Sequence, residues 1–283
     1  MRRLLAVFTV ILCSTAFAFA QGRDDHNDSG PILTGYGVVT PVAAATGGTI
    51  TGLVAFESFG LRNGFGVTSQ AGVLPADLTT NAILFVDTSG RLAKNLGVAI
   101  VNPNSSNVNV TLTLRNVTGS VLSTTIVNVP SHQQVSKYVT ELFSSQSAVP
   151  SEVTGTLVLT SGSPTLPVAI MGLRFRGINF STLPATSLSG PSAPMPIIAT
   201  NVGGPGAILL PQFAGGGGWA TEVVLVNNSP TALTVRVDLF RADGTPFLTA
   251  LNNRIASSFT DLVIPPGGVF TLAPRNLQGD DDF

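Results

Sequence analysis

The chain has 283 residues, of which 44% are hydrophobic and 10% are charged, and its formal net charge is −1 at pH 7. A composition this apolar and this poor in charge excludes intrinsic disorder, and the small net charge excludes electrostatic binding of nucleic acid. The length suits one large domain or two ordinary ones.

The first 20 residues have the pattern of an export signal. Arg2 and Arg3 form a positive start, residues 4–17 are apolar, and residues 18–20 (Ala-Phe-Ala) form a cleavage site. The apolar run is shorter than the roughly 20 residues that a membrane anchor needs. We therefore expect cleavage near Ala20, no transmembrane span afterwards, and a protein that is secreted, periplasmic or on the outer cell surface. The only cysteine, Cys13, lies in this leader, so we expect no disulfide in the exported chain.

After a flexible leader at residues 21–32, the sequence indicates one short strand after another. Between residues 108 and 115, apolar residues alternate with polar ones, which is typical of a strand with one buried face. Turn residues follow at 116–119 (Asn-Val-Thr-Gly), and similar turn signals recur along the chain. Helix is expected only as one short turn near residues 138–143. Many short strands separated by turns predict an immunoglobulin-like β-sandwich.

Part of the chain repeats without a gap 125 positions later. Ala82-Ile83-Leu84 returns as Ala207-Ile208-Leu209. Further matched pairs are Gly90 and Gly215, Val98 and Val223, Asn102 and Asn227, Val110 and Val235, Leu114 and Leu239, and Gly119 and Gly244. Such self-similarity indicates a duplicated structural unit. The predicted fold class is therefore all-β, with two tandem immunoglobulin-like antiparallel β-sandwiches built from a duplicated unit.

The predicted domain boundaries follow from this repeat and from composition. The first sandwich domain covers residues 33–183 and the second covers 207–275. A Pro/Gly-rich linker at 184–206 joins them, and an acidic tail at 276–283 is expected to be solvated.

A second match, with a spacing of 120, concerns residues 33–53. Thr34-Gly35 returns as Thr154-Gly155, and residues 50–53 return as 170–173. The later residues belong to the back strands of the first unit, whereas the second copy contains only front strands. Three arrangements are open: the N-terminal half-unit pairs with the C-terminal half of its own chain, pairs with another chain by strand exchange, or joins the first sandwich.

Residue patterns for catalysis are absent from the sequence. Neither histidine, His26 or His132, belongs to a recognisable catalytic pattern, and no nucleophile elbow, H-E-x-x-H or P-loop occurs. We therefore predict no enzyme activity and no catalytic, cofactor-binding or metal-binding residues. The one possible ligand contact is Trp219, the only tryptophan, which follows a run of four glycines. An exposed Trp219 would stack on a sugar ring, but a core position is the favoured interpretation.

The stretch from Gly216 to Asn227 has the pattern GGGW-x-T-x-x-x-L-V-N. Together with residues 264–268 (Ile-Pro-Pro-Gly-Gly), it resembles repeats in uncharacterised secreted bacterial proteins with tandem immunoglobulin-like sandwiches. In the first copy, Lys94 stands at the place of Trp219. The resemblance implies an exported bacterial β-sandwich protein and transfers no site residue.

These observations lead to one functional expectation with two alternatives. We expect a structural or adhesive protein of the bacterial envelope or extracellular space, which contacts a protein or polysaccharide at the cell surface. The alternatives are a carbohydrate-binding module that uses Trp219 and a subunit that self-associates into polymers by strand exchange.

Overall fold

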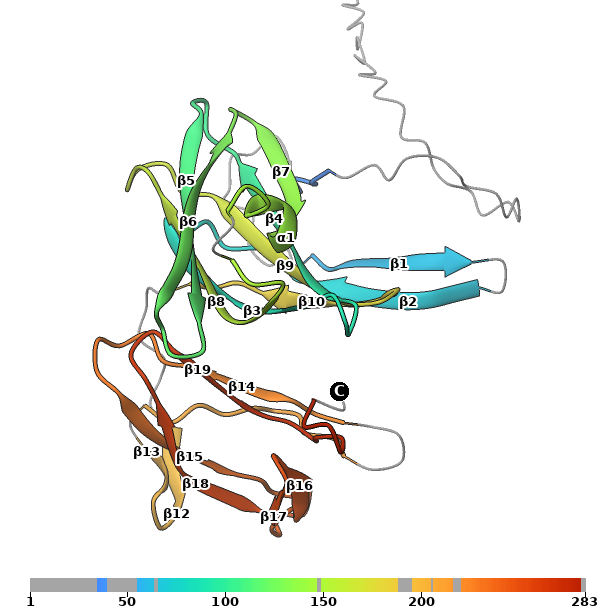
Figure 1. The fold of residues 1–283 in the computed structure, drawn as a ribbon, viewed down its shortest axis with the longest axis vertical. Coiled ribbons are helices and arrows are strands. Elements are labelled where there is room, and N and C mark those ends of the chain that lie inside the picture. The colour runs from blue at the N-terminus through green and yellow to red at the C-terminus, as the bar shows by residue number, and fades with distance from the viewer. Residues whose placement is uncertain are drawn as a thin grey trace, which may run out of the picture.

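A computed structural model describes residues 35–39, 55–63, 66–146, 149–187, 195–204, 206–215 and 220–280. These residues form antiparallel strands and, within the described ranges, a single short helix (Figure 1), which confirms the all-β prediction. The expected signal peptide and its cleavage site lie outside the described residues, and so does Trp219.

The first half of the chain, which here means the segment from β3 to β11, forms one large antiparallel sheet of nine strands. Its strands are β3 (Asn81–Ser89), β4 (Lys94–Asn102), β5 (Val108–Asn116), β6 (Val121–Val129), β7 (Gln133–Tyr138), β8 (Glu152–Ser161), β9 (Ala169–Arg176), β10 (Asn179–Pro184) and β11 (Thr186–Ser187). The short helix α1 (Val139–Leu142) follows β7, at the place where the sequence predicts a helical turn.

This sheet folds over into two layers. The β3–β4 pair is joined at one position only, Ser89 opposite Lys94, so the sheet bends there. One layer then has the order β6-β5-β8-β3-β11, and the other has the order β7-β4-β9-β10. The result resembles a sandwich, in which each layer can bury one face and expose the other.

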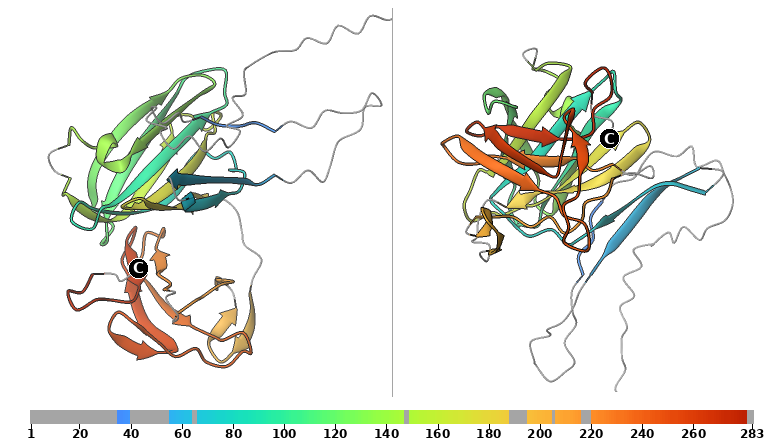
Figure 2. Two further views of the ribbon diagram at one scale, coloured as in Figure 1. Left: turned by 90° about the vertical axis from the view of Figure 1, so that its right-hand side faces the viewer. Right: turned by 90° about the horizontal axis from the view of Figure 1, so that it is seen from below.

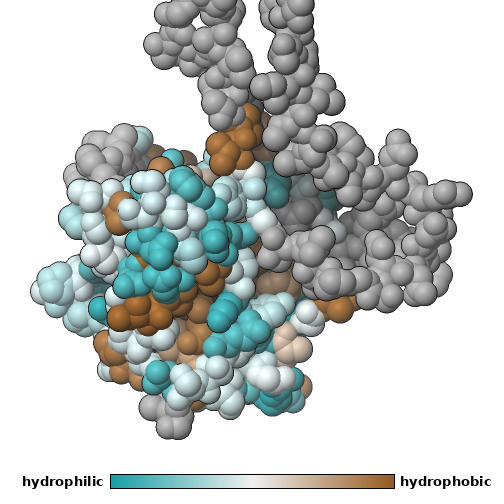
Figure 3. Space-filling view, turned by 90° about the horizontal axis from the view of Figure 1, so that it is seen from above, coloured by the Kyte–Doolittle hydropathy of each residue, from teal (hydrophilic) through white to brown (hydrophobic). Residues whose placement is uncertain are grey.

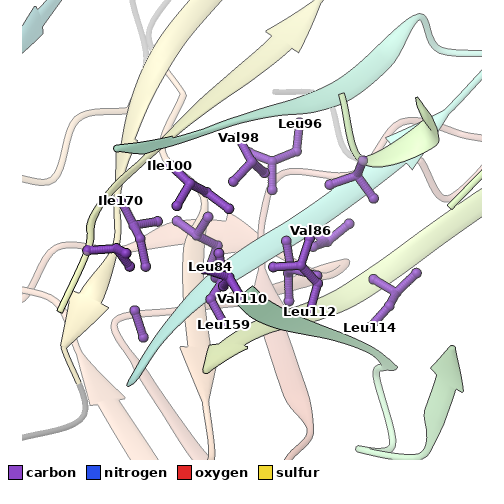
Figure 4. Packing of buried hydrophobic residues seen from close by; sticks show 14 of the residues in the cluster. Leu84, Val86, Leu96, Val98, Ile100, Val110, Leu112, Leu114, Leu159 and Ile170 are labelled. Atoms are coloured by element: carbon purple, nitrogen blue, oxygen red, sulfur yellow. The ribbon is translucent and has the colours of Figure 1, made fainter. Parts of the chain in front are cut away.

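Aliphatic side chains fill the space between the two layers (Figure 4). On β5, Val110, Leu112 and Leu114 are fully buried, and the residues between them are more exposed, as the alternating sequence predicts. Leu84 and Val86 of β3 belong to the same core. Each such side chain stabilises the fold by about 1.5–3 kcal/mol through burial.

The second half of the chain forms small two-stranded sheets around a separate core. Its strands are β12 (Met195–Ala199), β13 (Val202–Gly204), β14 (Val223–Val226), β15 (Leu233–Asp238), β16 (Thr249–Leu251), β17 (Arg254–Ala256), β18 (Ser258–Ile264) and β19 (Val269–Leu272). The pairs are β12–β13, β14–β19, β15–β18 and β16–β17. The core contains Leu239, Leu251, Phe259 and Leu272. The segment expected as a linker, 184–206, thus includes the hairpin β12–β13.

A hairpin near the N-terminus, β1 (Glu57–Asn63) and β2 (Gly66–Val73), lies along the edge strand β10. The Phe180 amide donates to Ser69 Oγ at 3.0 Å, and Thr182 Oγ1 donates to the Gly72 carbonyl at 2.9 Å. Residues 35–39, the described part of the expected half-unit 33–53, form no strand in this chain. The rest of that segment up to residue 53 lies outside the described residues.

Candidate interaction surface

Two buried asparagines, 125 positions apart, make the same hydrogen bonds. Asn102 Nδ2 donates to the carbonyls of Ser106, Val129 and Pro130 at 2.8, 2.9 and 3.1 Å. Asn227 Nδ2 donates to the carbonyls of Thr231, Ile264 and Pro265 at 2.8, 3.0 and 3.0 Å. Each Oδ1 accepts from the backbone amide two residues later in the chain. Both side chains are fully buried, so each fixes a turn between two strands of its own half.

At the positions nearest these asparagines, the strand pairs also have the same register, although β15–β18 has a shift after Val235. In the first half, Val101 pairs with Gln134 and Val110 pairs with Val127. The matching positions pair in the second half, where Val226 lies opposite Val269 and Val235 lies opposite Leu262. The partners on β18 and β19 are displaced by a further ten positions, because the hairpin β16–β17 is inserted between β15 and β18.

The two halves differ in what covers these strand pairs. In the first half, β5 lies between β6 and β8, and β4 lies between β7 and β9. Among the described residues of the second half, β15 pairs with β18 alone and β14 pairs with β19 alone. One edge of β15 and one edge of β14 are therefore open for pairing.

The second half also exposes an apolar segment that forms no strand. Residues 208–210 (Ile-Leu-Leu) are 53–84% exposed, whereas the matching residues of β3, 83–85 (Ile-Leu-Phe), are at most 7% exposed. Leu233 of β15 is 41% exposed, whereas the matching Val108 of β5 is 1% exposed. We call residues 207–210 the acceptor strip. A run of large exposed apolar side chains makes this strip a candidate interaction surface.

A buried group of four charges joins the two halves. Lys94 Nζ lies 2.9 Å from Asp87 Oδ2, and Arg174 bridges Asp87 (2.9 Å) and Glu222 (2.5 Å). Glu222 immediately precedes β14, while the other three residues lie on β3, β4 and β9. Burial alone lowers the pKa of Arg174, but Glu222 and Asp87 outweigh this effect and keep the pKa above its ordinary value. The four charges sum to zero, and their pairing compensates part of the cost of removing them from water.

Two further contacts hold the halves together. In the left view of Figure 2, the second half lies below the first. The Val269 amide donates to the Val117 carbonyl at 2.9 Å. Gly119 has a φ of 83°, and a Cβ there would lie 1.9 Å from the Pro266 carbonyl oxygen, so only glycine fits this turn.

The acidic tail also contacts the first half. Asp280 accepts two hydrogen bonds from Arg91, at 2.6 and 2.9 Å. These bonds and the charge of Arg91 lower the pKa of Asp280 below its ordinary value. At this residue the tail therefore contacts the first half.

Of the two histidines, only His132 lies in the described part of the chain. His132 occupies a turn with a φ of 54°, and its carbonyl accepts a hydrogen bond from the Tyr36 hydroxyl at 2.9 Å. An open cavity of about 480 Å³ is lined in part by Tyr138, Phe175 and Lys94, but the Lys94 ammonium is directed to Asp87. In the described parts of the chain, no group of three or more His, Cys, Asp or Glu residues could hold a metal ion. Nor does any described helix have the length and apolar character to cross a membrane.

Comparison with known proteins adds no relative: no protein-family model, curated protein or solved structure matches the chain.

Proposed function

We propose that this chain is an exported structural or adhesive protein of the bacterial envelope or extracellular space. In this proposal, the chain is a tandem array of immunoglobulin-like sandwiches derived from one duplicated unit, and it acts by presenting surfaces to a partner, without catalysis.

The observation that carries the proposal is the matched pair Asn102 and Asn227. Each side chain donates to three carbonyls at matching positions, and the neighbouring strand pairs have matching registers. Both features support the duplication that the sequence repeat indicates. Tandem sandwiches joined by a buried contact suit a rigid extracellular scaffold. On the face seen in Figure 3, apolar side chains lie among polar ones, as on a surface able to contact another protein or a polysaccharide.

Export is the part of the proposal that can be tested most directly. The full chain would be expressed in a bacterium, and the cell fractions and the medium would be analysed by mass spectrometry. We expect the processed protein to begin at Gln21 and to occur outside the cytoplasm. A chain that keeps residues 1–20 and stays in the cytoplasm would refute the proposal.

A further inference from the structure

We propose that residues 36–39 of one chain pair as a strand with the acceptor strip of a second copy, so that chains join head to tail. We call residues 36–39 the donor segment. This inference rests on the proposed duplication, and it names the partner of the exposed surface in the second half.

The register follows from the complete first half. There, β8 lies between β3 and β5, with Val158 opposite Ile83 and also opposite Thr113. The donor segment matches residues 156–159 of β8 at a spacing of 120, and the acceptor strip matches residues 82–85 of β3 at a spacing of 125. Applied to the second half, the same pairing places Val38 opposite Ile208 and Val39 opposite Ala207. On its other side, the donor segment would reach the open edge of β15.

Both segments expose apolar side chains in the single chain. Val38 is 76% exposed and Val39 is 66% exposed, and neither lies in a strand. Their matching residues Val158 and Leu159 lie inside the sheet, and Leu159 is 1% exposed. Pairing the two segments would bury both sets of side chains and satisfy an open sheet edge, which is the usual basis of recognition by strand addition.

The positions of the two segments favour a second copy over closure within the chain. Tyr36 contacts His132 at the start of β7, so the donor segment lies on the first half, and Figure 1 shows it as the short blue segment beside β7. The acceptor strip belongs to the second half, which lies at the other end of the molecule in the same view. A contact between different surfaces of identical chains propagates into a linear assembly unless it closes into a ring.

The pairing is short. Pro211 follows the acceptor strip and has no backbone N–H to donate, and Gly37 brings no side chain to the place of Leu157. We therefore expect reversible association that depends on protein concentration.

Cysteine cross-linking of the processed chain, which lacks native cysteine, tests the register directly. Two preparations, Val38→Cys and Ile208→Cys, are mixed and mildly oxidised, and a second mixture uses Val39→Cys with Ala207→Cys. Adjacent antiparallel pairs alternate between wide and close spacing, so the close pair has the geometry for a disulfide. We expect a disulfide-linked dimer in at least one mixture. The control, Val38→Cys mixed with Leu209→Cys, should give none, because Leu209 faces the opposite side of the strand.

Sedimentation of the unsubstituted processed chain gives a second measurement that needs no variant. We expect the mean mass to rise with concentration. The proposal is overturned by a constant monomer mass without cross-linking in either mixture. It is also overturned if the double variant Val38→Cys/Ile208→Cys forms its disulfide only within one chain at every concentration. Both experiments use purified protein, so they are independent of whether export itself is confirmed.

Discussion

The matched asparagines allow a quantitative test of the proposed duplication. Replacing Asn102 or Asn227 by alanine removes three donated hydrogen bonds and at least one accepted bond from a fully buried site. Nδ2 carries two hydrogens, which the three carbonyls share. At a net contribution of about 1 kcal/mol for each of these two N–H groups and for the accepted bond, either substitution should lower the free energy of unfolding by about 3 kcal/mol.

Urea unfolding of the processed chain, followed by circular dichroism, measures this loss. Because the two halves have separate cores, we expect Asn102→Ala to shift the unfolding of the first half and Asn227→Ala to shift that of the second. The control is Asn128→Ala, since Asn128 donates only to Asn109 on the exposed face of the sheet. Its effect should stay within about 0.5 kcal/mol.

A large loss for Asn102→Ala together with an effect below about 1 kcal/mol for Asn227→Ala would refute the reasoning. It would mean that the two asparagines occupy matching positions of the repeat and make the same hydrogen bonds but do not stabilise the fold equally.

Three further predictions concern the core and the joint between the halves. Trp219 should be buried, so its fluorescence should be blue-shifted, and Trp219→Ala should lower the free energy of unfolding by about 3–5 kcal/mol. A red emission maximum that moves on adding polysaccharide would favour the carbohydrate-binding alternative. Glu222→Ala leaves the Arg174 charge buried with one partner fewer, so calorimetry should show a loss of about 3 kcal/mol in the free energy of unfolding. An unchanged melting temperature would show that Glu222 does not stabilise the contact between the halves. Gly119→Ala should destabilise the chain more than Gly244→Ala, because φ is 83° and 81° at the two turns but only Gly119 is packed against the other half. Equal losses would show that the packing contributes nothing.

The sequence by itself indicates the all-β class and the matching positions of the proposed repeat. Alternation along residues 108–115 predicts the buried face of β5, and Val110, Leu112 and Leu114 are fully buried. This prediction succeeds because a strand's two faces follow directly from its period of two. The repeat likewise identifies Asn102 and Asn227 as matching positions, although nothing in the sequence announces their carbonyl partners.

Only the tertiary structure decides which of these segments become paired strands. Ala-Ile-Leu occurs at 82–84 and again at 207–209, yet the first copy is buried and most of the second is exposed. The local sequence is the same, so the difference comes from β8, which pairs with β3 and has no described counterpart in the second half. The charged group was equally hidden: Asp87, Lys94 and Arg174 meet through the pairing of β3, β4 and β9, and Glu222 joins them only where the two halves pack. Burial and pairing depend on non-local neighbours, and a pattern within one segment carries no record of them.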